Sequence, residues 1–139
     1  MSRFQLIAIG FSTLLWAPCV AAEANLSDQE ISQRIIGSWN IPPDSVDYSE
    51  PKAWGIETFK ADGTYVLYLF HDPACTSVRK QVNVYWVVKK GVLITTYSDG
   101  RKIRDEVVSI GSRRMMLRSL KDGVTFIRER TLRCAKALS

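Results

Sequence analysis

Few side chains in this 139-residue sequence have the types and spacing that catalysis or metal binding requires. The single histidine, His71, precedes Asp72 in a predicted turn, and we interpret the two as solvated loop residues. Asp105 and Glu106 are adjacent in a predicted strand, so they point to opposite faces and cannot share one acid–base site. The sequence lacks motifs for a nucleophilic serine, a phosphate-binding loop, a zinc protease or a C-x-x-C pair. We therefore expect a protein that is not an enzyme and that needs no metal or cofactor.

The amino terminus has the pattern of a secretory signal peptide. Arg3 precedes an apolar run over residues 6–16, and small residues follow this run. We expect residues 1–22 to be removed, which leaves residues 23–139 as a single periplasmic or extracellular domain. Two alternatives are a membrane anchor and a lipid attached to Cys19. The apolar run is shorter than the about 20 residues that a membrane-spanning helix needs.

The mature chain would have modest charge and two cysteines. Loss of Arg3 leaves 18 basic and 14 acidic residues, a net charge of +4, which is too weak to indicate a nucleic-acid partner. No later apolar run is long enough for a membrane-spanning helix. Cys75 and Cys134 remain, and two cysteines in an oxidising compartment most often form one disulfide.

The elements that would carry these side chains are a short helix and eight short strands. Ser27 and Glu30 match a capping box, which predicts a helix over residues 28–36 that ends at Gly37. After it, runs rich in β-branched and aromatic residues alternate with turn pairs such as Asp62-Gly63. The predicted strands cover residues 38–41, 53–60, 64–71, 79–88, 92–98, 102–110, 115–120 and 124–130.

The short connections require neighbouring strands to be antiparallel. A meander of this kind favours an all-β fold, an eight-stranded antiparallel up-and-down barrel with a short N-terminal helix. A two-sheet sandwich is the alternative, but it usually needs a long connection, and only residues 42–52 offer one. The strand over residues 64–71 is apolar on both faces, and we expect Ile31 and Ile35 of the helix to cover its outer face.

Gly37-Ser38-Trp39 directly follows the predicted helix and opens the first strand. This triplet resembles the G-x-W signature of lipocalins and the wider calycin group, and the resemblance spans roughly residues 36–130. In that family the tryptophan packs at the closed end of the barrel, and an arginine late in the last strand lies across its ring. The resemblance implies this role for Arg128 or Arg130 and a small apolar or amphipathic ligand in the barrel.

Aromatic and methionine side chains on the predicted strands are candidates for such a binding site, because ligand pockets favour aromatic walls. The candidates are Trp54, Tyr68, Trp86, Tyr97, Met116 and Phe126. Ordinary core packing is the alternative role for each of them. A filled barrel would instead favour a protein-interaction module, such as an inhibitor or an envelope-complex subunit, with exposed aromatics such as Tyr48.

Charged residues near the predicted turns divide between the two ends of the barrel. The end that contains Trp39 would carry a basic rim, formed by Lys60, Lys89, Lys90, Arg113 and Arg114. The opposite rim would mix acidic and basic residues: Asp44, Asp47, Glu50, Asp72, Asp99 and Asp122 with Lys52, Arg101 and Lys121. These charges are either ordinary turn polarity or, at the basic rim, a contact for an anionic surface or an acidic protein.

Overall fold

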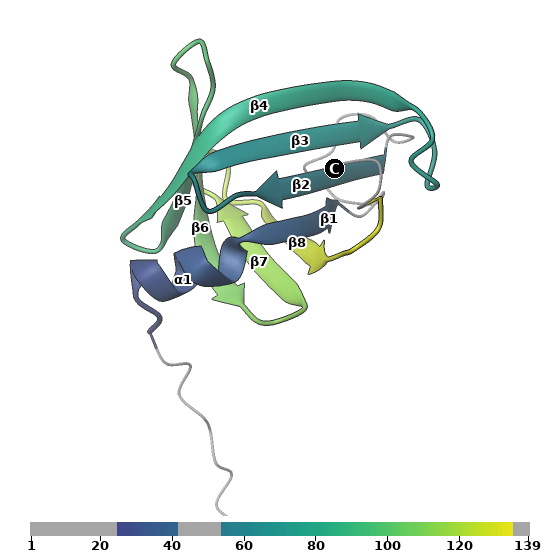
Figure 1. The fold of residues 1–139 in the computed structure, drawn as a ribbon. Helices are drawn as coiled ribbons and strands as arrows, with labels where there is room; N and C mark the ends of the chain where they lie inside the picture. The colour runs from purple at the N-terminus through teal and green to yellow at the C-terminus, as the bar shows by residue number, and fades with distance from the viewer. Residues whose placement is uncertain (1–24, 42–53, 135–139) are drawn as a thin grey trace, which may run out of the picture.

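The computed structural model describes residues 25–41 and 54–134. The predictions for residues 1–24, and those for Asp44, Asp47, Tyr48, Glu50 and Lys52, lie outside the described residues. One helix precedes the strands, which follow one another along the chain (Figure 1). The elements are α1 (Asp28–Ile35), β1 (Gly37–Ile41), β2 (Trp54–Phe59), β3 (Thr64–Phe70), β4 (Val78–Lys89), β5 (Val92–Thr96), β6 (Lys102–Ile110), β7 (Arg114–Ser119) and β8 (Thr125–Arg130).

The strands form a closed antiparallel barrel in which each strand pairs with the next and β8 pairs with β1. This confirms the predicted eight-stranded up-and-down barrel with a short N-terminal helix and excludes the sandwich. The seam between β1 and β8 is short, with Trp39 opposite Arg130 and Asn40 opposite Glu129. By contrast β3 and β4 pair along the full length of β3 and arch over the barrel (Figure 1).

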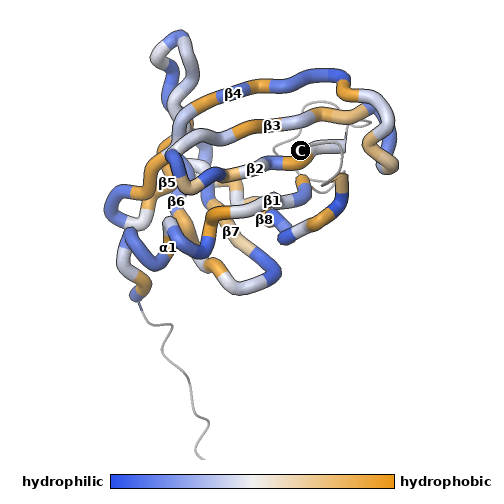
Figure 2. Tube along the Cα trace, viewed as in Figure 1, coloured by the Kyte–Doolittle hydropathy of each residue, from blue (hydrophilic) through white to orange (hydrophobic). Residues whose placement is uncertain are grey.

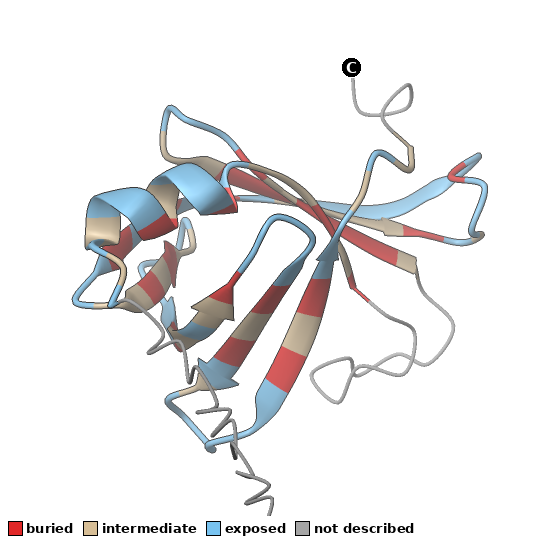
Figure 3. Cartoon of the chain, turned by 90° about the horizontal axis from the view of Figure 1, so that it is seen from below, coloured by how far each residue is buried: buried red, intermediate tan, exposed pale blue. Residues whose placement is uncertain are grey.

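Burial alternates along the strands, as a barrel with one face toward a core requires. Bands of buried residues alternate with exposed ones in Figure 3, and apolar and polar residues alternate along β4 in Figure 2. In β4 the buried residues are Val84, Trp86 and Val88, while Tyr85 and Val87 face solvent. The buried residues join the main core inside the barrel.

Helix α1 closes one end of the barrel, which we call the closed end. The Ser27 hydroxyl and the Glu30 carboxylate form the predicted capping box at its start. The Asp28 carboxylate accepts hydrogen bonds from the backbone N–H groups of Lys90 and Gly91 in the β4–β5 turn, at 2.7 and 2.8 Å. Its buried residues, Ile31 and Ile35, join the main core; the helix contacts β4 and β6. The expectation that α1 covers the outer face of β3 is therefore wrong.

That outer face is covered by a second apolar cluster, held by a disulfide between Cys75 and Cys134 whose Cα atoms are 5.7 Å apart. The bond confirms the predicted pairing, although Cys75 lies in the β3–β4 connection and β8 ends near α1. The tail after β8 folds back along the barrel wall: Arg133 donates to Asn40 Oδ1 at 2.7 Å and to the Pro73 carbonyl at 3.0 Å. We call this the outer cluster: Ile56, Phe70 and Cys75, with Trp54, Tyr68 and Cys134 packed against them.

Candidate functional site

The residues that carry the lipocalin resemblance meet at the closed end. Trp39 is fully buried, and its Nε1 donates to the Ile35 carbonyl at 2.7 Å. The Arg130 guanidinium lies over its ring, 4.2 Å from the centroid, and also donates to the carbonyls of Ile36 and Ser112, each at 2.9 Å. The expected arginine–tryptophan stacking is thus confirmed, with Arg130 as the arginine.

Gly37 is required at the same place. Its φ is +123°, a conformation that side chains disfavour, and a Cβ atom there would lie 2.5 Å from Arg130 Nη1. The glycine of the G-x-W triplet therefore lets the helix end pass close to the guanidinium. Arg34 also contributes, because its Nη1 donates to the Ile110 carbonyl and its own carbonyl accepts from Arg130.

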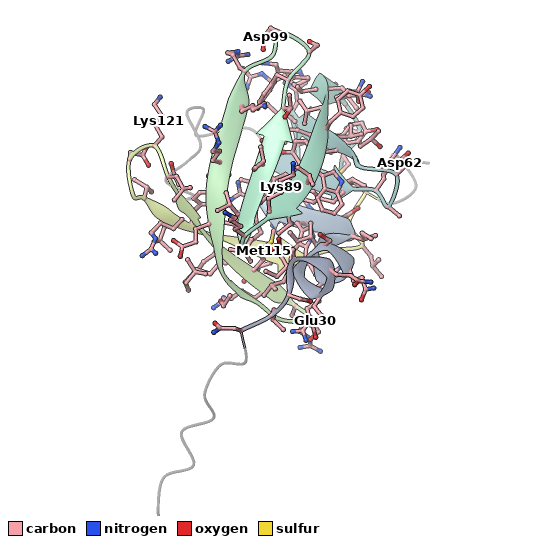
Figure 4. The ribbon with its side chains drawn as sticks, turned by 90° about the vertical axis from the view of Figure 1, so that its left-hand side faces the viewer. Glu30, Asp62, Lys89, Asp99, Met115 and Lys121 are labelled. Carbon is pink, nitrogen blue, oxygen red and sulfur yellow. A yellow bond between two sulfur atoms is a disulfide. The ribbon has the colours of Figure 1, made fainter. Side chains whose placement is uncertain are left out.

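A cavity of about 1260 Å³ occupies the other part of the barrel interior. Residues of the β5–β6 and β7–β8 turns line it, so it opens at the end opposite α1. Figure 4 shows Asp99 and Lys121, from these two turns, far from Glu30 of the helix. Its lining is about equally apolar and polar, and its apolar part includes Ile41, Phe59, Leu67, Leu69, Leu93, Leu117 and Phe126.

A buried ion pair forms part of this lining. Arg128 is 3% exposed and Glu57 9%, and Arg128 Nε donates to Glu57 Oε2 at 2.6 Å. The Tyr65 hydroxyl donates to Glu57 Oε1 at 2.9 Å, and Arg128 Nη2 reaches the same oxygen at 3.3 Å. Both carboxylate oxygens therefore have partners, which buried charge demands. Burial, and then the neighbouring Glu57 carboxylate, raise the pKa of Tyr65 well above its ordinary value, so its hydroxyl stays a donor.

The structure distributes the predicted ligand-binding residues over four places. Tyr97 and Phe126 line the cavity. Trp86 points into the barrel nearer the closed end, where it packs edge-on against Phe59 and donates to the Lys60 carbonyl at 3.0 Å. Trp54 and Tyr68 belong to the outer cluster, and Met116 pairs in register with Ile127, outside the set that lines the cavity.

Sequence reasoning missed Glu57 and Tyr65 as interior polar groups and assigned Arg128 only to the closed end. The register places Glu57 opposite Trp39, so both point into the barrel. One signal was available in the sequence: a glutamate two positions before Phe59 falls on the inward face of an otherwise apolar strand. Orienting β2 from the G-x-W tryptophan would have identified it.

Charged residues lie at both ends of the barrel. Lys60, Lys89, Lys90, Arg113 and Arg114 are exposed at or beside the closed-end turns. At the opposite end the cavity has a rim that we call the mouth, formed by Arg79, Lys80, Arg101, Lys102, Arg104, Lys121 and Asp122. Arg101 is paired with Asp99 at 2.6 Å and lies 4.9 Å from the Tyr97 ring centroid. Most of the mouth's positive charge comes from residues at strand ends. The sequence prediction considered only charged residues near the turns and therefore missed them.

Comparison of the chain with protein-family models, with curated proteins and with solved structures finds no match. Within residues 25–41 and 54–134, no helix has the length and hydropathy to cross a bilayer. Within the same described residues, no three His, Cys, Asp or Glu side chains lie close enough together to hold a metal ion. The site is therefore described by its own geometry, a cavity with apolar and polar side chains in its lining, a paired interior charge and a charged mouth.

Proposed function

We propose that this chain is a secreted, lipocalin-like protein that binds a small apolar or amphipathic molecule in its barrel without chemical turnover. The observation that carries the proposal is the cavity of about 1260 Å³, well above the roughly 300 Å³ at which ligand pockets begin. The stacking of Arg130 on Trp39 beside Gly37 supports the lipocalin-like part of the proposal.

The wall of the cavity supports an apolar ligand of modest affinity. Burial of about 200 Å² of ligand surface would contribute near 5 kcal/mol at 25 cal/mol per Å². The loss of translational and rotational freedom on association offsets part of this, so we expect dissociation constants in the micromolar range.

The interior polar groups support binding rather than catalysis. Glu57, Arg128 and Tyr65 are engaged with one another through hydrogen bonds of 2.6 to 3.3 Å. A general acid or base must reach a proton of the substrate, and a carboxylate held on both oxygens is poorly placed to do so. We assign this group a role in filling and orienting the interior.

The proposed location is the periplasm or the extracellular space. The Cys75–Cys134 disulfide supports an oxidising compartment. The signal-peptide pattern over residues 1–22 points the same way.

A protein-interaction module is the second candidate, and the outer face of β4 favours it. Tyr85 is 67% exposed there, and Val87 is also exposed. Exposed aromatic residues are enriched at protein interfaces. Under this hypothesis the same protein would capture a specific partner through β4 and leave the cavity without a ligand.

A displacement titration distinguishes the two functions. The oxidised chain 23–139 is titrated with an apolar fluorescent dye, and dodecanol is then used to displace the dye. Leu67→Trp places an indole in the cavity that Leu67 lines and should weaken dye binding, while Tyr85→Trp adds the same indole to the outer face and should leave it unchanged. Equal effects of the two changes, or no saturable binding by the unaltered chain, would contradict the proposal.

A further inference from the structure

The charges around the cavity are unevenly distributed between its interior and its mouth. Three charged residues of the described part of the chain line the interior, Glu57, Asp105 and Arg128, which gives a formal charge of −1. Counted over residues 25–41 and 54–134, the mouth carries six basic residues against Asp122, a formal charge of +5, or +4 when Asp99 beside Arg101 is included. A ligand in this cavity therefore meets a negative interior and a positive rim.

We propose that the ligand is a single-chain amphiphile with an anionic head, a carboxylate or a phosphate, that binds with its chain inside and its head at the mouth. This inference rests on the proposed function, since it names the chemistry of the molecule that the cavity takes. Lys80 has the best position for a head-group contact, because its register partner Leu69 lines the apolar wall. Lys102 and Lys121 line the rim from β6 and from the β7–β8 turn.

The opposite orientation, with the anionic head at the interior arginine, is disfavoured by what Arg128 already contacts. Its Nε and Nη2 donate to Glu57, and its Nη1 donates to the Ile127 carbonyl at 3.2 Å. A second carboxylate there would approach Glu57 in a site of low dielectric, where like charges repel strongly. At the mouth a head group would stay partly hydrated and could contact Lys80, Lys102 or Lys121.

Because the charges of the mouth are exposed, their effect on the dissociation constant should be moderate. Each solvated ion pair contributes modestly, and salt screens it. Reversal of three lysines both removes attraction and adds repulsion, so the dissociation constant should rise about tenfold.

The test compares three probes that share one chain: dodecanoate, dodecanol and dodecyltrimethylammonium, each displacing the apolar dye from the oxidised chain 23–139. We expect dodecanoate to bind more tightly than dodecanol, and added salt to reduce this preference. The triple variant Lys80→Glu, Lys102→Glu, Lys121→Glu should weaken dodecanoate binding about tenfold and change dodecanol binding less than about twofold. The matched control Lys60→Glu, Lys89→Glu, Arg113→Glu makes the same charge change at the closed end and should leave dodecanoate binding near its original value.

The possible results separate the two proposals. If none of the probes displaces the dye and the dye itself does not bind, the proposed binding function fails. If dodecanol and dodecanoate bind equally and the mouth variant weakens neither, binding stands but the anionic head is wrong. Tighter binding of the ammonium probe, or equal weakening by the closed-end control, would also overturn the inference. Sedimentation with phosphatidylglycerol vesicles, without displacement of dye by dodecanoate, would assign the mouth to a membrane surface instead.

Discussion

Two arginines on the same side of β8 stabilise different parts of the molecule. Arg130 lies over Trp39 and joins the end of α1 to the β6–β7 turn through carbonyl contacts. Arg128, two residues earlier, lies in the barrel interior against Glu57 and 4.6 Å from the Phe126 ring centroid. Sequence position alone could not assign the two roles, because both side chains point inward and only the register distinguishes them.

At the closed end, Trp39→Ala should cost about 3 to 5 kcal/mol of unfolding free energy, the range for deletion of a large core aromatic. Trp39 is fully buried in the main core, so the change leaves a cavity and removes the stacking partner of Arg130. Urea denaturation followed by circular dichroism measures the loss. A change below about 1 kcal/mol would contradict the structural role of the G-x-W residues.

For the interior ion pair, Glu57→Gln should cost about 3 kcal/mol, because it removes the carboxylate charge that accepts from the buried Arg128 guanidinium. Glu106→Gln is the matched control, since Glu106 pairs with Arg118 on the surface and exposed pairs contribute about 0 to 1 kcal/mol. Both are measured as shifts in the urea midpoint. Equal costs for the two variants would indicate that the interior pair is hydrated.

Tyr65 gives the protein a pH dependence in the alkaline range. Its folded pKa lies well above the unfolded value of 10.0 because burial, and then Glu57, disfavour the phenolate. The unfolded chain therefore loses its proton first, so this contribution to stability is complete below about pH 10 and declines as the pH rises above it. Tyr65→Phe should make the fall in unfolding free energy between pH 9 and 11 less steep. An unchanged slope would contradict the burial of the hydroxyl.

At the scale of elements, turn chemistry and strand composition predicted most of the barrel. The strand predicted over residues 102–110 matches β6, and the helix predicted over residues 28–36 ends one residue later than α1. Asp62-Gly63 forms a turn as expected, because Gly63 adopts a φ of +83°. These signals are local, so they can be interpreted without knowledge of the tertiary structure.

The outer cluster could not be predicted in the same way. β3 is apolar on both faces, and periodicity cannot tell which face meets the core. What covers its outer face is a distant tail, held by contacts of Arg133 with Asn40 and Pro73. For the same reason Trp54 and Tyr68, which looked like pocket residues, belong to this cluster.

Loss of the disulfide should release that tail. Replacement of Cys75 and Cys134 by serine should lower the unfolding free energy by about 4 kcal/mol, the loop-entropy value for a bond that closes 59 residues. Chemical denaturation of the oxidised chain and the double variant measures the difference. Detection of two free thiols by mass spectrometry, under denaturing and non-reducing conditions, would contradict the disulfide itself.

Docking of α1 should depend on acid pH through Asp28. Hydrogen bonds from the backbone N–H groups of Gly91 and Lys90 lower the pKa of this carboxyl below 3.8. Its contribution to stability is therefore present above about pH 4 and is lost as the pH falls. Asp28→Asn should reduce the dependence of the unfolding free energy on pH between pH 2 and 4, which thermal unfolding measures. The control variant Asp122→Asn, at the opposite end of the barrel, should leave hydrogen exchange in α1 unchanged. An unaltered helix in the Asp28 variant would contradict the anchoring role.

At the scale of the whole molecule, the described residues form a barrel that α1 closes at one end and whose cavity opens at the other end. The closed end is held by Trp39 and Arg130, and the cavity lies between these residues and the mouth. The sequence could predict the closed barrel but not the volume of its cavity, because that volume depends on how the inward side chains pack. Side chains of similar composition can fill a barrel or leave it hollow.

The most direct test of a binding cavity is a methyl NMR titration of the oxidised chain with dodecanoate. Leu69 and Leu117 line the cavity, and their methyl signals should shift saturably with one common dissociation constant. Val87 and Val108 are exposed on the outside of the barrel, and their signals should stay in place. Saturable shifts confined to the interior methyls are the predicted result. Shifts confined to Val87 and Val108, or no saturable shift at any methyl, would contradict the account.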